Sequence, residues 1–190
     1  MNHKSISIKY SKFILITSIV ILGGIVTVFS ARLAVLFSLL INPLADGIIS
    51  GLFFVWLISL ALFVNKPGIV LFCSIIMGAI EGVIGKAIFF NTIGFSLLAG
   101  ISIETVMILL NWIFEGKKKL IISAMIAGLM AGISRCLILQ ILAGPFPPAW
   151  LIRYWLTCII GGTVIGGGFG WLIYIVFRKI NFFLLKEKTV

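Results

Sequence analysis

The chain alternates between long apolar runs and short segments that are polar or rich in glycine and proline. A helix that spans a bilayer needs about 20 apolar residues, and a window of that length finds six candidate spans. They are Phe13–Ala31, Gly47–Val64, Gly68–Ile84, Ile93–Phe114, Leu120–Leu142 and Trp150–Phe177. The pattern predicts an all-α integral membrane protein, a bundle of six transmembrane helices that forms a single domain over residues 1–190.

The connections between these runs carry residues that interrupt helices. They are Asn42-Pro43, Asn65-Lys66-Pro67-Gly68, Glu115-Gly116 and Gly144-Pro145-Phe146-Pro147-Pro148. One further apolar stretch, Leu33–Leu44, is too short to span. We expect it to form a separate interfacial or re-entrant piece between the first two helices.

Basic residues indicate which side of the membrane each connection occupies. Six spans place both termini on one side, and eleven of the fifteen Lys and Arg residues fall there: Lys4, Lys9, Lys12, Lys66, Lys117, Lys118, Lys119, Arg178, Lys179, Lys186 and Lys188. The positive-inside rule makes this side cytoplasmic, so both termini are predicted to be cytoplasmic in a multi-pass plasma-membrane protein. A basic start before an apolar run also begins a signal peptide. Here the run is long enough to span and lacks a clear small-x-small cleavage site.

Composition excludes most soluble functions. The chain is 62% hydrophobic and 11% charged, whereas soluble domains are about 45–50% apolar and about 25% charged. The net charge of +10 is explained by cytoplasmic loops rather than by nucleic-acid binding. No P-loop, HExxH or GxSxG motif is present, so neither nucleotide hydrolysis nor a catalytic residue is predicted. The lone histidine and three scattered cysteines predict no metal site and no cofactor.

Seven ionisable residues lie outside the cytoplasmic clusters, in the middle or outer half of the predicted bundle. Charges within membrane segments are costly and indicate functional sites by default. The seven are Arg32, Asp46, Glu81, Lys86, Glu104, Arg135 and Arg153. We interpret them as a polar cavity that opens away from the cytoplasm. The alternative is that they pair with one another, Glu81 with Arg135 for example, only to hold helices together.

Aromatic residues allow two interpretations. The five tryptophans, Trp56, Trp112, Trp150, Trp155 and Trp171, are typical of interfacial belts. Phe146, Trp150, Tyr154 and Trp155 also gather near Arg153, where they could form a wall on which a flat heterocycle stacks.

Small residues recur at a spacing of four, which places each set on one helix face. The sets are Gly78 and Gly82, then Ala124, Gly128 and Gly132, and finally Gly162, Gly166 and Gly170. They predict either tight internal packing or a flat sliding surface for a partner subunit, and the sequence does not rank the two.

The third and fourth spans resemble a known family. The run Asn65-Lys66-Pro67-Gly68 leads into a helix with Ala79-Ile80-Glu81-Gly82-Val83-Ile84-Gly85, followed by Glu104 and Asn111-Trp112. This arrangement is similar to the S components of energy-coupling-factor (ECF) vitamin transporters, in particular the YkoE-like branch for thiamine or its hydroxymethylpyrimidine precursor. Many S components carry an Ala-x-x-x-Ala pair on the first helix for docking, and this chain has only Gly23-Gly24 and Thr17-Ser18 there.

The resemblance implies a protein that is not an enzyme, that captures a vitamin-like molecule from outside and that has no ATPase of its own. Its partners would be a membrane coupling subunit and two ATPase subunits. Combined with the charge pattern, it leads to the predicted substrate-binding residues Asp46, Glu81, Glu104, Trp112, Arg135, Trp150, Arg153 and Tyr154. Glu81 and Glu104 are expected to converge in one cavity.

Two other functional classes remain as alternatives. One is a secondary transporter, an exporter or a channel. The other is a small membrane enzyme that acts on a lipid or isoprenoid, with the buried carboxylates as its acid/base pair. A channel would require a polar stripe through both leaflets, whereas the ionisable groups here stop near mid-depth.

Overall fold

The structure is a computed structural model that describes residues 3–40, 45–64, 66–85, 89–113, 118–143 and 147–187. Within these residues the chain is helical apart from the short turns that join the helices. In order the elements are α1 (His3–Leu40), α2 (Ala45–Ile49), α3 (Gly51–Val64), α4 (Ile69–Gly85), α5 (Phe89–Ile113), α6 (Lys118–Ala143), α7 (Pro148–Ile160), η1 (Gly161–Phe169) and α8 (Gly170–Glu187).

Within the described residues, the six predicted spans lie on these helices except for turns at Ser50 and Gly68. Five segments of this part of the chain are long and apolar enough to cross a membrane: Ile16–Leu33, Gly47–Val64, Thr92–Trp112, Leu120–Ile141 and Pro148–Lys179. The sixth, Ile69–Ile84, is a shorter apolar helix. The prediction of an all-helical membrane bundle is therefore confirmed.

The first helix is longer than the sequence pattern predicted. We expected Leu33–Leu44 to form a separate piece, but α1 continues without a break through Leu40. This expectation was wrong because residues 32–42 contain no glycine or proline that would interrupt the helix. The first residue able to stop a helix is Pro43, which disfavours helical geometry at the residue before it. Residues 41–44 lie outside the described part of the chain.

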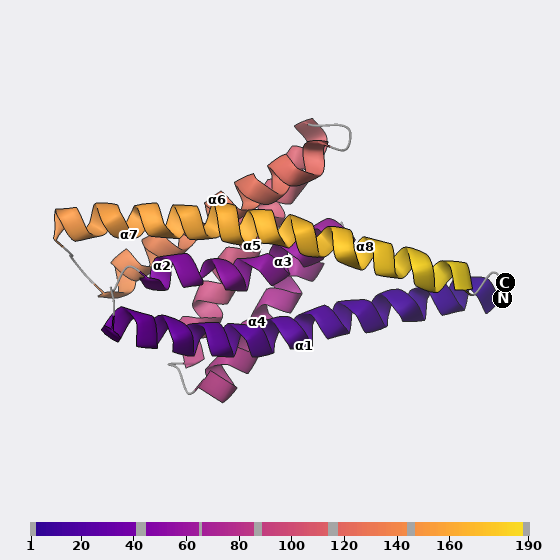
Figure 1. Ribbon diagram of the computed structural model, residues 1–190, viewed down its shortest axis with the longest axis horizontal. Coiled ribbons are helices and arrows are strands. Elements are labelled where there is room, and N and C mark those ends of the chain that lie inside the picture. Colours follow the sequence, from indigo (N-terminus) through magenta and orange to yellow (C-terminus); the bar gives the residue numbers. More distant parts are fainter. Residues whose placement is uncertain are drawn as a thin grey trace.

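The last span is one uninterrupted helical rod composed of α7, η1 and α8 (Figure 1). Its middle segment, Gly161–Phe169, is a π-helix, a form in which each N–H bonds to the carbonyl five residues earlier and which is rare beyond a single turn. Five of its nine residues are glycine.

The helix α3 forms the centre of the bundle. About two thirds of Gly47–Val64 (67%) is buried inside the molecule, compared with 28–39% of the other four long spans. The side chains of Phe54, Leu57, Ile58 and Leu60 on α3 are fully buried. Figure 1 shows α3 between α1 and α8.

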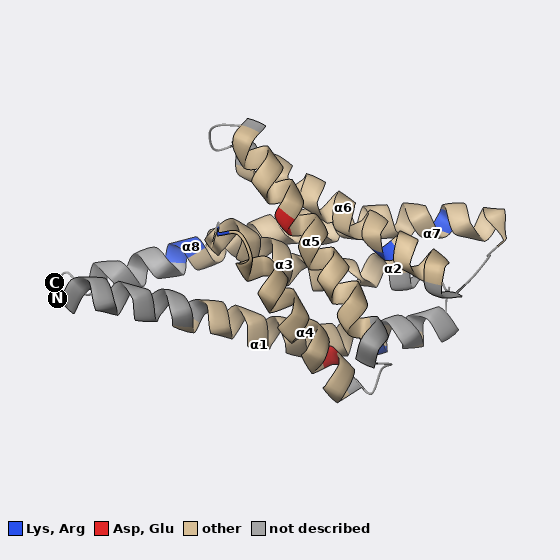
Figure 2. Cartoon of the chain, turned by 180° about the vertical axis from the view of Figure 1, so that it is seen from behind, with Lys and Arg blue, Asp and Glu red and all other residues tan. Residues whose placement is uncertain are grey.

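The start of α1 and the end of α8 lie at the same end of the molecule (Figure 1). An even number of spans has this consequence. Figure 2 shows basic residues on α8 toward that end, and Arg178 and Lys179 are exposed there. That this end faces the cytoplasm stays a prediction from the charge pattern.

The repeated small residues pack inside the bundle. A Cβ atom added to Gly167 would lie 2.7 Å from the Ala124 carbonyl oxygen, and one on Gly166 would lie 2.8 Å from Cβ of Phe54. Gly128 and Gly162 likewise face each other's backbone. The glycines of the last span thus serve two neighbours, α6 on one side and α3 on the other. Of the two interpretations of these glycines, internal packing is therefore confirmed.

Candidate functional site

Glu104 on α5 holds the beginning of α4. Its Oε1 accepts a hydrogen bond from the backbone N–H of Gly68, and its Oε2 accepts one from the N–H of Leu71 at 3.0 Å. The first N–H groups of a helix have no partner within the helix, and the positive end of the helix dipole attracts a carboxylate. Gly68 permits the approach because it adopts φ +86°, a left-handed conformation that glycine tolerates best.

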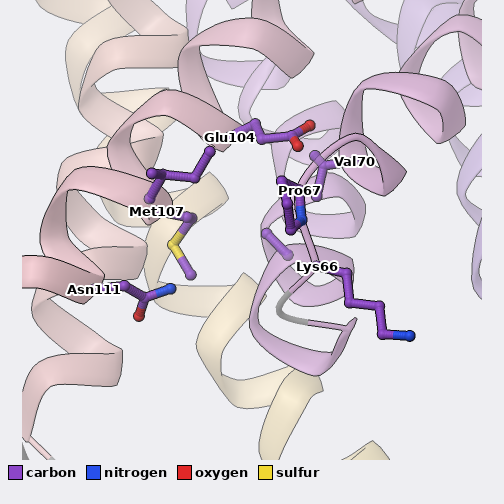
Figure 3. A pocket seen from close by; sticks show the side chains of 8 residues that line it. Lys66, Pro67, Val70, Glu104, Met107 and Asn111 are labelled. Carbon is purple, nitrogen blue, oxygen red and sulfur yellow. The ribbon is translucent and has the colours of Figure 1, made fainter.

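A small hollow adjoins this contact (Figure 3). Figure 3 shows Glu104 directed toward the start of α4, Lys66 extending away and Met107 between Glu104 and Asn111. The hollow has a volume of about 50 Å³, enough for a few water molecules, since one water occupies about 10–15 Å³ by this measure. It is therefore too small for a vitamin.

Glu81 lies near the opposite end of α4. Thirteen residues separate it from Gly68, which corresponds to about 20 Å along a helix that rises 1.5 Å per residue. Figure 2 shows acidic residues at separate places on α4 and α5. The expectation that Glu81 and Glu104 converge in one cavity is therefore wrong. In the present arrangement each oxygen of the Glu104 carboxylate accepts a hydrogen bond from the backbone of α4.

The Glu81 end of the hairpin is half-buried and tightly packed. The side chain of Glu81 is half-buried and its Oε2 atom is buried. One turn earlier, Gly78 packs against Ser96 of α5, and a Cβ there would lie 3.3 Å from the Thr92 carbonyl oxygen. Glu81, three residues further along α4, therefore lies toward the beginning of α5.

An aromatic cluster with one cation is centred on Phe95 of α5. The Arg135 guanidinium on α6 lies over the ring of Phe95, with Cζ 4.7 Å from the ring centroid. The Phe95 ring in turn lies 5.4 Å from that of Phe53 and 6.0 Å from that of Phe54. A guanidinium over an aromatic face is a favourable cation–π arrangement, and more so away from water. Three helices thus fix the position of the Arg135 side chain.

A second aromatic pair lies on α7, which packs against α6. The rings of Trp150 and Tyr154 on α7 stack with centroids 5.1 Å apart and an angle of 6° between their planes. Tyr154 is buried with Cys136 and Cys158. Because Cys136 follows Arg135 directly, one turn of α6 connects both aromatic clusters.

The remaining predicted residues lie apart from these clusters. Trp112, on the last described turn of α5, is 89% exposed, which is typical of an interfacial belt residue. Arg153 is exposed on α7. The side chains of Asp46 and Phe146 lie outside the described residues. The structure thus pairs Arg135 with Phe95 and Trp150 with Tyr154, whereas Glu104 caps α4 and Trp112 is exposed.

Sequence reasoning missed the phenylalanines that organise Arg135. Phe53, Phe54 and Phe95 are three of sixteen phenylalanines in the chain, and each lies in an apolar run where nothing distinguishes it. The only local feature that could have drawn attention to them is that two phenylalanines are adjacent at positions 53 and 54. Its partner Phe95 comes from a helix about forty residues further along.

These features define a multi-pass plasma-membrane protein of the transporter class. The chain belongs to the family described as ABC-type cobalt transport system, permease component, whose family model matches residues 11–134, more than half of the chain. A crystal structure described as an S-component of an ECF transporter is similar in fold, with a TM-score of 0.79. The two sequences are 19% identical, and the match covers 94% of this chain and 93% of the other. No curated protein is significantly similar in sequence.

Proposed function

We propose that this protein is the substrate-binding subunit of an ECF-type importer. Membership of a family of transport permeases and the fold shared with an S component support this assignment. The sequence contains no nucleotide-binding motif, so the free energy for uptake would come from a partner or from an ion gradient, and an ECF-type importer uses partners. These partners would be a membrane coupling subunit and ATPase subunits.

The proposed substrate is thiamine or a hydroxymethylpyrimidine-like precursor, captured from outside. An aminopyrimidine offers a ring nitrogen and an amino group that a carboxylate can pair with, and a thiazolium adds a positive charge. Glu81 supplies a half-buried carboxylate, and the Phe95 and Trp150–Tyr154 clusters supply aromatic faces for stacking. The observations that support the proposal are the half-buried carboxylate of Glu81 on α4 and the Arg135 guanidinium that lies over the Phe95 ring.

Within this proposal, the predicted set of contacts becomes smaller. The contacts that remain are Glu81, Arg135, Trp150, Tyr154, Asp46 and Arg153. Glu104 and Trp112 are removed, because one caps α4 and the other is exposed at the far end of α5.

The family description raises cobalt as a different cargo. A site for Co²⁺ would draw on clustered imidazole, thiolate or carboxylate ligands. Among the described residues, no group of three or more His, Cys, Asp and Glu side chains is placed to hold a metal ion. We therefore keep a pyrimidine, and not Co²⁺, as the proposed substrate.

Equilibrium binding to the purified protein in detergent tests this proposal. Tryptophan fluorescence is a suitable readout because Trp150 stacks on Tyr154 beside the proposed site. We expect saturable binding of thiamine or hydroxymethylpyrimidine without ATP, and no saturable response to CoCl₂. Binding of Co²⁺ without binding of any pyrimidine would contradict the proposed substrate. Tight binding of an anionic vitamin instead would shift the contacts to Arg135 and Arg153.

A further inference from the structure

The helices α1 and α4 touch and then diverge, which leaves a groove between them on the surface of the bundle. The two helices meet closely at Gly24, where an added Cβ would lie 2.9 Å from Cδ1 of Ile80. Toward the end of α4 the helices leave a groove with a volume of about 250 Å³. It is lined by Ile25, Val28, Phe29 and Arg32 of α1 and by Ile84 of α4.

The walls of this groove are apolar and open to the surroundings. Phe29 is 65% exposed and Ile84 is 52% exposed. Both lie on helices that cross or enter the bilayer, so their exposed surfaces face lipid tails rather than water. The groove can therefore accept a flexible hydrocarbon chain without displacing polar solvent.

Arg32 places one positive charge at the end of this apolar groove. Arg32 is exposed and stands at the end of the span Ile16–Leu33. No hydrogen bond or ion pair joins it to any other residue within the described part of the chain. A charge in the hydrocarbon core is costly, so a long arginine side chain at this depth extends to the headgroup level. Glu81 lies one turn before Ile84 and is not part of the groove lining.

We propose that this groove is a binding site for an anionic phospholipid of the leaflet at that end of the molecule. One acyl chain lies between Phe29 and Ile84, and the headgroup phosphate accepts hydrogen bonds from the Arg32 guanidinium. The planar guanidinium suits this role because it donates two parallel hydrogen bonds to phosphate oxygens. Basic pockets between transmembrane helices bind lipid headgroups in this manner.

Native mass spectrometry of the purified protein, titrated with phosphatidylglycerol or phosphatidylcholine, tests the site. We expect Arg32→Gln to weaken phosphatidylglycerol binding about fivefold, since one surface cation contributes about 1 kcal/mol toward an anionic lipid. Phosphatidylcholine binding should change much less. The matched control is Arg178→Gln, which removes an exposed arginine from α8 and should leave phosphatidylglycerol binding in this groove unchanged. Equal losses in both variants, or no loss in Arg32→Gln, would overturn the proposal.

A second variant tests the contribution of the acyl chain to binding separately from that of the headgroup. Ile84→Trp fills the groove from an exposed position and should reduce the binding of both lipids, with the folded state checked by circular dichroism. Glycerol phosphate carries the headgroup chemistry without the chain, and we expect it not to compete with phosphatidylglycerol. Full competition by glycerol phosphate would overturn the role of the groove. Wild-type dimers that Ile84→Trp abolishes would also overturn the proposal, because a second copy would then be the occupant.

Discussion

Glu81 and Glu104 stand at opposite ends of the α4–α5 hairpin, each a half-buried carboxylate in an apolar helix. In sequence the two are alike, since both interrupt a spanning segment near a glycine. In the structure they differ in what lies opposite. Glu104 faces the first N–H groups of α4 and binds them. Glu81 lies near the other end of α4, about one turn beyond the contact of Gly78 with Ser96.

This difference shows that the role of a carboxylate within a membrane depends on which part of the neighbouring backbone it meets. A helix start offers free N–H donors and a positive dipole end, and a carboxylate there is satisfied by the fold itself. At a helix's carboxyl end the dipole is negative and the N–H groups are already bonded. Under the proposed function, Glu81 near that end of α4 is the carboxylate that contacts a cationic ligand.

The largest expected effect concerns Glu81. We expect Glu81→Gln to weaken thiamine binding by roughly ten- to a hundredfold, because a charge-assisted hydrogen bond contributes about 1.5–3 kcal/mol. The unfolding temperature should change little. Titration calorimetry of the wild type and this variant measures the effect, and Glu104→Gln is the matched control at the other end of the hairpin. Unchanged affinity in Glu81→Gln would remove Glu81 from the proposed site.

The next prediction concerns the close packing between α4 and α5 at Gly78. Gly78→Ala places a Cβ 2.7 Å from Cβ of Ser96, so we expect the free energy of unfolding to fall by about 1–3 kcal/mol. Gly94 on α5 has no atom within 4 Å of such a Cβ. Gly94→Ala should therefore be neutral or stabilise by up to about 1 kcal/mol. Denaturation of the detergent-solubilised protein compares the two, and equal effects would contradict the close packing at Gly78.

The smallest expected effect concerns Glu104. Glu104→Ala removes the acceptor for two backbone N–H groups and should lower the free energy of unfolding by about 0.5–2 kcal/mol, the range for loss of a helix cap. Glu104→Gln keeps one amide oxygen and should cost less. Thiamine affinity measured well below the unfolding temperature should change less than twofold. A tenfold loss of affinity with normal stability would restore Glu104 as a ligand contact.

The spans and the turn at Lys66-Pro67-Gly68 were predictable because each depends on local sequence. Apolar runs of span length predict helices, and a Pro-Gly pair predicts a turn. The extension of α1 to Leu40 was missed because a window of span length ends a helix at its expected length, although the residues that follow continue it. The sequence pattern could have predicted this extension, because no residue that interrupts a helix lies between Ala31 and Asn42-Pro43.

The contacts of the site were harder to predict because they join distant parts of the chain. The partner of Glu104 is a backbone N–H thirty-six residues away, and a backbone donor leaves no residue type to recognise. Arg135 was identified as unusual, but its partner Phe95 is one apolar residue among many. The glycines of the last span formed a clear pattern in the sequence. Only the structure shows that they occupy two faces of that span, because α3 packs against one face and α6 against the other.

Reconstitution into proteoliposomes tests most directly the claim that this chain binds its substrate but does not supply the energy for transport. We predict that the isolated chain in liposomes binds thiamine or hydroxymethylpyrimidine but does not accumulate it, with or without a proton or sodium gradient. Accumulation should appear when the coupling subunit and ATPase subunits are co-reconstituted with ATP. If the isolated chain concentrated the substrate on an ion gradient, the account would be contradicted. Glu81 would then be better interpreted as an ion-coupling site of a secondary transporter.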